Sequence, residues 1–233
     1  MQNERNKTIA ATLPGSAQVR SSGLDRASSA VLRNTYRLLA MTLAFSAMIA
    51  GVSAALRLPH PGIMLTLAGY FGLLFLTSHL RNSAWGLVSV FALTGFMGYT
   101  LGPIIGAYLS LPGGPDIVLT AMGATAVIFL GLSWYARRES APDMSRIGSF
   151  LMIGILTAFA LGLAAYFLSM PALSLAVSAM FILLMSGLIM FQTQAIVRGG
   201  ETNYIMATVT LFVSIYNLFA SLLQILGFLG GEE

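Results

Sequence analysis

Cysteine is absent from the 233 residues, lysine occurs once, and charged side chains make up only 9% of the chain. Without cysteine there can be no disulfides, thiolate metal sites, iron–sulfur clusters or cysteine nucleophiles. A soluble globular domain carries roughly 25% charged residues, so this chain has too few charges to cover a surface that faces water. Two histidines and eight acidic residues remain, which argues against an enzyme and against a cofactor or metal site.

Apolar residues dominate instead, at 57% of the chain with a mean hydropathy of +0.83. A transmembrane helix needs about 20 mostly apolar residues, and the charged residues, together with Gly/Pro turns at 112–115 and Pro171, divide the chain into seven stretches of about that length. These expected spans are 38–56, 62–80, 84–111, 117–135, 147–168, 172–196 and 204–228. The sequence therefore predicts an all-α membrane protein with a seven-helix transmembrane domain over 30–233, preceded by a flexible cytoplasmic tail, 1–29.

The basic residues predict the orientation of these spans. Eleven of the twelve lie in the tail or in the loops after the second, fourth and sixth spans, and Arg57 alone lies on the other side. Because loops rich in Lys and Arg stay in the cytoplasm, we expect a cytoplasmic amino terminus and an outer, periplasmic carboxyl terminus. The pI near 9.7 then reflects topology, and no nucleic-acid partner is expected. The partner common to all spans is the lipid bilayer.

Small residues recur at four-residue spacing in three of the spans. Helices in lipid associate where small residues let their backbones approach closely, so these positions predict helix packing. Pro103, inside the first of these runs, predicts a kinked or broken helix. Such a helix can act as a gate, but helix packing is the favoured interpretation of these residues. The positions are Gly98, Gly102 and Gly106; Gly154, Ala158 and Gly162; and Ser46, Ala50 and Ala54.

The last span carries a polar stripe. Spacings of four, three, four and three residues keep its five members on one helical face, which should face other helices or a water-filled cavity rather than lipid. Interhelical hydrogen bonding is the favoured interpretation, and the lining of a conduction path or a site for a partner's helix is the alternative. The stripe consists of Thr210, Ser214, Asn217, Ser221 and Gln224.

Membrane-embedded chemistry lacks its usual residues. Lys7, the only lysine, lies in the tail, so a retinal Schiff base within the bundle is excluded. The aspartates lie in the tail or in loops, and His79 lies at the end of a span, so neither an aspartyl pair nor a Ser/His pair is available at bilayer depth. With no ionisable residue deep in a span, a proton relay also lacks its anchor.

Two segments resemble a known family. The run 198–205, which includes the loop residues Gly199, Gly200, Glu201, Asn203 and Tyr204, and the run 211–219 are similar to the carboxyl-terminal signature of the Bax inhibitor-1 family. Further similarity at 31–36, 43–46, 95–99 and 171–173 extends the resemblance over 31–228. It is closest to the bacterial branch whose members modulate the FtsH protease.

The resemblance implies a fold in which a central last helix is wrapped by the other six. It also implies a protein of the bacterial inner membrane that binds the membrane-anchored ATP-dependent FtsH protease, within its membrane complex, and restrains degradation. The tail 1–29 lies outside the resemblance. Its composition is typical of an inert extension, and the alternative hypothesis is a flexible handle that the protease engages.

Some family members leak calcium through a path controlled by two facing aspartates. The matching positions here are Gln192 and Ser214. These side chains do not titrate, whereas a coupled pair of carboxylates does. The alternative function is therefore a calcium or cation leak channel that is insensitive to pH.

Overall fold

The computed structural model describes residues 14–230, with side chains from residue 27 onward. Each expected span is a helix whose ends lie within a few residues of the expected ones, except at the start of the first. Seven of the helices are long and apolar enough to cross a membrane, which confirms the predicted fold class. The elements are α2 (Pro14–Ala55), α3 (Ile63–Leu80), α4 (Trp85–Leu109), α5 (Gly114–Ala136), the 3₁₀ turn η1 (Ser145–Ile147), α6 (Gly148–Phe167), α7 (Pro171–Val197) and α8 (Tyr204–Gly230).

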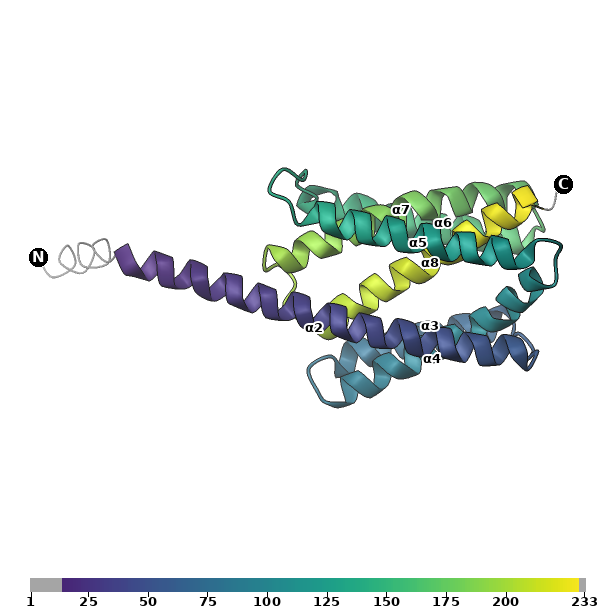
Figure 1. The fold of residues 1–233 in the computed structure, drawn as a ribbon, viewed down its shortest axis with the longest axis horizontal. Helices are drawn as coiled ribbons and strands as arrows, with labels where there is room; N and C mark the ends of the chain where they lie inside the picture. Colours follow the sequence, from purple (N-terminus) through teal and green to yellow (C-terminus); the bar gives the residue numbers. More distant parts are fainter. Residues whose placement is uncertain (1–13, 231–233) are drawn as a thin grey trace, which may run out of the picture.

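The helices form two layers with α8 between them (Figure 1). Helices α2, α3 and α4 make one layer, and α5, α6 and α7 make the other. Helix α8 runs obliquely from the first layer to the second. It packs against α2, α4, α5 and α7. The stronger expectation, a last helix wrapped by all six others, stays a prediction.

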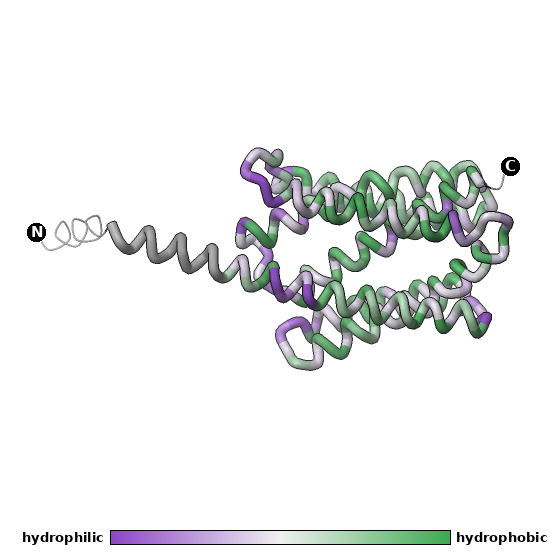
Figure 2. Tube along the Cα trace, viewed as in Figure 1, coloured by the Kyte–Doolittle hydropathy of each residue, from purple (hydrophilic) through white to green (hydrophobic). Residues whose placement is uncertain are grey.

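Hydrophilic residues gather at the two ends of the bundle, and the helix surfaces between them are apolar (Figure 2). Large apolar side chains such as Phe75, Val127 and Leu183 are more than two-thirds exposed on the outside. Such a surface is stable against lipid tails and not against water. The turns α3–α4, α5–α6 and α7–α8 lie at the same end, which we call the basic end because Arg81, 137–138, Arg146 and Arg198 are there.

Helix α2 begins earlier than its expected span. It starts at Pro14 and extends beyond the rest of the bundle (Figure 1), so residues 14–29 of the expected flexible tail are helical. Proline is well tolerated in the first turn of a helix, where its missing N–H is not needed, and no further proline interrupts the helix. The remainder of the expected tail, residues 1–13, lies outside the described residues.

Helix α4 continues through Pro103 without a break. Proline lacks an N–H, so the carbonyl four residues earlier, that of Tyr99, loses its helical donor. The hydroxyl of Ser53 in α2 donates to this carbonyl at 3.1 Å. In a membrane a freed backbone group must be satisfied within the protein, and α2 provides the donor.

The glycines of α4 lie where this helix meets α2. A Cβ atom at Gly98 would come within 2.4 Å of the backbone oxygen of Ser46, and one at Gly102 within 2.4 Å of the Ser53 Cβ. At Gly106 the nearest atoms, those of Ala54, would lie at 3.9 Å, an ordinary contact. Only glycine therefore permits this helix spacing at the first two positions. In α6, Gly154 and Gly162 face Leu184 and Val177 of α7.

Candidate functional site at the basic end

The turn between α7 and α8 is built by the residues of the signature loop. Gly199 has a φ of +74°, a left-handed conformation that favours glycine. The backbone N–H groups of Gly200 and Glu201 donate to the carbonyl of Ala195 at 2.8 and 2.9 Å and close the end of α7. The carboxylate of Glu201 accepts a hydrogen bond from the N–H of Asn203 at 2.7 Å.

Asn203 links this turn to two neighbours. Its Oδ1 accepts hydrogen bonds from the N–H groups of Ile205 and Met206, both at 3.0 Å, and so caps the first turn of α8. Its Nδ2 donates to the carbonyl of Arg81 at 3.0 Å and to Oδ1 of Asn82 at 2.9 Å. One side chain therefore fixes both the start of α8 and the α3–α4 turn.

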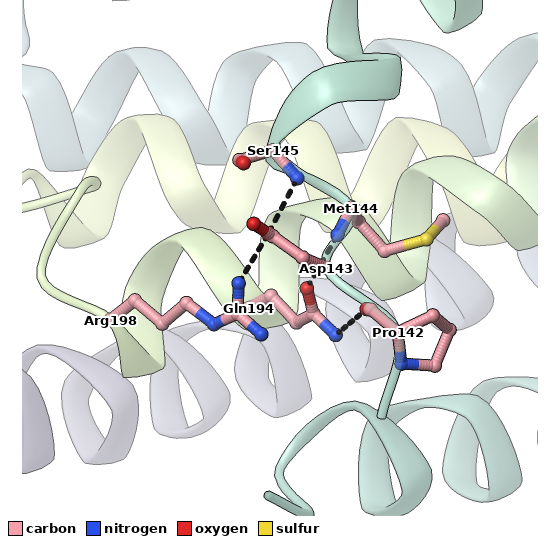
Figure 3. Close-up of polar contacts among 6 residues, drawn as sticks. All are labelled: Pro142, Asp143, Met144, Ser145, Gln194 and Arg198. Atoms are coloured by element: carbon pink, nitrogen blue, oxygen red, sulfur yellow. Dashed lines mark hydrogen bonds and ion pairs between the residues drawn. The ribbon is translucent and has the colours of Figure 1, made fainter. Parts of the chain in front are cut away.

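Gln194 holds the α5–α6 loop against α7 (Figure 3). Its Oε1 accepts a hydrogen bond from the Met144 N–H at 3.0 Å, and its Nε2 donates to the Pro142 carbonyl at 2.9 Å. The side chain is 3% exposed. A buried amide that uses both its donor and its acceptor on one loop fixes the position of that loop, because either group left unpaired would carry a desolvation cost.

Asp143 and Arg198 form an ion pair beside this contact (Figure 3). The pKa of Asp143 lies below its usual value, mainly because its carboxylate accepts a hydrogen bond from the Ser145 backbone N–H at 3.0 Å. The Ser145 side chain and Arg198 lower this pKa further. The carboxylate is therefore ionised throughout the neutral range. Both side chains are about half exposed, so solvent screens the pair and its contribution to stability is small.

These contacts join three turns into one ordered surface, which we call the cap: residues 81–82, 142–145 and 194–203. Two arginines next to it are held by aromatic rings. The guanidinium of Arg137 lies 4.8 Å from the centre of the Tyr36 ring, and that of Arg138 lies 3.6 Å from the Trp134 ring. Within the cap, Arg81 and Arg198 are balanced by Asp143 and Glu201. The positive charge of this end therefore comes from the neighbouring Arg137 and Arg138, which the rings hold in place.

Gln192 and Ser214, the positions that the resemblance predicts to match the aspartate pair, are both buried. The Ser214 hydroxyl donates to the carbonyl of Thr210 in its own helix at 2.8 Å, as short hydroxyl side chains in helices commonly do. No hydrogen bond joins Gln192 to Ser214 among the described contacts. The alternative function, a cation leak through these positions that is insensitive to pH, stays a prediction.

The polar stripe of α8 follows a groove between α3 and the α6–α7 pair. Its Thr210 lines one cavity, of about 600 Å³, together with Tyr70 of α3 and Leu188 of α7. Asn217, Ser221 and Gln224 line a second, of about 560 Å³, nearer the opposite end of the bundle.

One stripe residue makes hydrogen bonds to another helix among those described. The Ser178 hydroxyl donates to Gln224 Oε1 at 2.7 Å, and Gln224 Nε2 donates to the Ser174 hydroxyl at 2.6 Å. Asn217 donates to Val213 within α8. The stripe thus combines interhelical bonding at one position with a polar lining at others.

Sequence reasoning missed the residues that hold the α5–α6 loop. Gln194 lies within an apolar run that the sequence predicts only as a span, and the sequence identifies Asp143 only as a loop aspartate. Neither carries a motif, because a loop clamp needs only a matching distance between an amide and two backbone groups. The family signature, by contrast, does indicate the loop residues 199–204.

The fold and the cap define a class: a polytopic α-helical membrane protein whose ordered polar contacts concentrate at one end of the bundle. Among the described residues no group of three His, Asp or Glu side chains could hold a metal ion. Residues 28–231 match the family model described as inhibitor of apoptosis-promoting Bax1. The chain belongs to the Bax inhibitor-1 family, and the resemblance seen in the sequence is confirmed.

Several bacterial relatives match most of the chain. It is 54% identical to an Escherichia coli K12 protein named modulator of FtsH protease YccA, over 85% of this chain and 90% of the relative. It is also 54% identical to an uncharacterized protein of Pseudomonas aeruginosa, over 90% of this chain and 94% of the relative. An uncharacterized membrane protein of Vibrio cholerae is 40% identical over 92% of this chain and 97% of the relative.

Proposed function

We propose that this chain is a non-catalytic regulator in the bacterial inner membrane that binds the membrane-anchored FtsH protease and restrains its degradation of other membrane proteins. The observation that carries the proposal is the 54% identity to a protein named modulator of FtsH protease, over nine-tenths of that relative's length. A relative from another Escherichia coli strain, also 54% identical over 85% of this chain, is named an inner membrane protein, which supports the location.

The proposed orientation places the basic end in the cytoplasm. The cap and its neighbours carry most of the arginines of the bundle, and the opposite end has Arg57. Under the positive-inside rule the amino terminus is then cytoplasmic and the carboxyl terminus periplasmic. A membrane-anchored protease with cytoplasmic ATPase activity would meet the cap and the amino-terminal segment.

We assign the contact with the protease complex to the cap. Its turns are fixed by Gln194 and Asn203, so a partner binding there would have few loop conformations to order. The projecting part of α2 is the second candidate contact, and the tail 1–29 would act as a handle for the protease. If deletion of residues 2–26 leaves the restraint unchanged, the handle role is wrong and the cap alone would carry the function.

The test is degradation of an unstable membrane substrate by purified FtsH in liposomes, with and without this protein, and with a calcium dye inside. We expect slower degradation and no dye response. Unchanged degradation together with a dye response would contradict the proposal and favour the alternative, a pH-insensitive cation leak.

Two matched variants assign the effect to the cap. Gln194→Leu removes the two hydrogen bonds to the α5–α6 loop, and Gln224→Leu removes two hydrogen bonds to α7 near the opposite end. We expect the first to weaken the restraint and the second to preserve it. An equal effect of both variants would show that general stability, and not the cap, controls the restraint.

A further inference from the structure

Five buried side-chain polar atoms among the described residues have no hydrogen-bond partner within the protein. All of them lie on α2, α5 and α7 toward the basic end. They are Thr35 Oγ1, Tyr36 OH, Ser133 Oγ, Gln192 Nε2 and Thr193 Oγ1. Buried polar groups in folded proteins are nearly always paired, so five such atoms in one region call for a physical cause.

Contacts between the helices place these residues at similar depth. Near the basic end, a Cβ at Gly199 would lie 3.3 Å from the Ser28 hydroxyl. Helix α2 enters the bundle after Ser28, and α7 leaves the bundle just before Gly199. Thr35 and Gln192 each lie seven residues from this point of contact, which corresponds to about 10 Å at 1.5 Å per residue. The Thr208 hydroxyl of α8 lies 3.3 Å from the Thr35 carbonyl, at the same level.

Helix α5 completes the arrangement. The Tyr36 ring lies 6.0 Å from that of Phe129 and 4.8 Å from the Arg137 guanidinium. Ser133 lies four residues from each of these, so it belongs to the same face of α5. Helices α2 and α5 both pack on α7. The five atoms therefore lie at a similar level, about two helical turns from the basic end. We call this level the polar layer.

The hydroxyls of this layer differ from others buried in the bundle. Thr42, Thr100 and Thr125 donate to carbonyls of their own helices at 3.0, 2.9 and 2.7 Å. Such bonds are the usual means of satisfying a threonine in a helix. Thr35 and Thr193, each 0% exposed, do not make them.

We propose that the polar layer binds a cluster of ordered water molecules. Water both donates and accepts, as do the hydroxyls of the layer, and a buried water makes about three hydrogen bonds. A bare cation does not fit, because Gln192 Nε2 can only donate and the layer contains no carboxylate.

The layer ends against apolar side chains on the side away from the basic end. Ile189 and Leu211 are 0% exposed, and Phe212 is 1% exposed. These residues lie about one turn deeper than Thr193 and Thr208. The bound water is thus confined to one end of the bundle, and it gives this membrane protein a hydrated site that the protease-modulator function does not require.

Water–protein magnetisation transfer by NMR tests the proposal on the full chain in lipid nanodiscs. We expect transfer from water to Thr35, Thr193 and the Gln192 side-chain amide to be at least several-fold stronger than transfer to Thr42. Thr42 is the matched control, since it is equally buried and its hydroxyl is bonded within its own helix. Transfer at Thr35 and Thr193 as weak as at Thr42 would overturn the proposal.

A variant tests whether the water molecules form a cluster. Thr193→Val removes a hydroxyl without changing the shape of the side chain, so we expect transfer to the Gln192 amide to fall by half or more. Thr42→Val should leave it unchanged. An unaltered Gln192 signal in folded Thr193→Val protein would refute a shared cluster, and if that variant does not fold, the comparison within the wild-type protein still decides.

Discussion

The close approach of α4 to α2 gives a sharp prediction, because α4 contains two glycines in contrasting environments. In Gly98→Ala the added Cβ would lie 2.4 Å from the Ser46 backbone oxygen, whereas in Gly106→Ala it would lie 3.9 Å from Ala54. Ordinary contacts begin at 3.4 Å, so the first variant must separate the two helices by about 1 Å. The second variant requires no movement.

The expected magnitude follows from comparing the two variants. Both gain the helix preference of alanine over glycine, about 0.5–1 kcal/mol, so this contribution cancels in the comparison. Overpacking costs about 1–3 kcal/mol, and it applies to Gly98→Ala alone. We therefore expect the free energy of unfolding of Gly98→Ala to be about 1–3 kcal/mol lower than that of Gly106→Ala.

Reversible unfolding in detergent micelles, by titration with sodium dodecyl sulfate and circular dichroism, measures this difference. Gly106→Ala should be as stable as the unchanged protein or slightly more stable. If the two variants unfold together, the helices are not in the close contact described, and the packing argument for this pair fails.

Three further predictions concern hydrogen bonds. Gln194→Leu should raise the hydrogen-exchange rate of the Met144 amide by about fivefold, since a net hydrogen bond contributes about 1 kcal/mol, and Gln192→Leu should not. Equal rates in the two variants would contradict the role of Gln194 in holding the loop. Asp143 has a pKa below its usual value of 3.8, so its contact with Ser145 should be complete above that pH and lost only as the pH falls through the lowered pKa. An NMR titration of the Ser145 amide with a midpoint at or above 3.8 would disagree. Ser53→Ala should lower the free energy of unfolding by about 1 kcal/mol, and by much less in a Pro103→Ala background, where the Tyr99 carbonyl regains its helical donor; equal losses in a double-mutant cycle would refute that role of Ser53.

The spans could be predicted from the sequence because charged residues or Gly/Pro turns, such as Pro171, interrupt every apolar run near the required length. The start of α2 could not, since the Ser- and Ala-containing segment before Ser29 has no property that separates a helix from a flexible tail. Pro103 predicts a kinked or broken helix, whereas α4 continues through it. The donor that bonds the Tyr99 carbonyl, Ser53, lies in another helix and becomes visible only when α2 and α4 are packed together.

In the candidate site, too, some residues could be predicted from the sequence and others could not. The signature loop was recognisable because Gly199 and Asn203 act through local backbone geometry, which a short motif can encode. Gln194 acts through distance, as its amide reaches a loop about 50 residues away along the chain. A single sequence contains no record of that pairing.

Restoring carboxylates at the family's paired positions separates burial from conduction. In Gln192→Asp with Ser214→Asp, both introduced groups lie at positions at most 6% exposed. Burial disfavours the ionised form of a carboxyl. The folded protein should then hold protons that the unfolded chain releases, so the free energy of unfolding should fall as the pH rises, by up to about 1.4 kcal/mol per pH unit for each proton.

Calcium flux into dye-loaded liposomes gives the second readout for this double variant. A pH-dependent flux requires a conduction path beyond the carboxyl pair, and the buried Ile189, Leu211 and Phe212 close the bundle beside it. We therefore expect a pH-dependent stability without flux, and neither effect in the uncharged control, Gln192→Leu with Ser214→Ala. Flux that changes with pH would show that a path crosses this apolar layer, and the leak function would then be the better account of the protein.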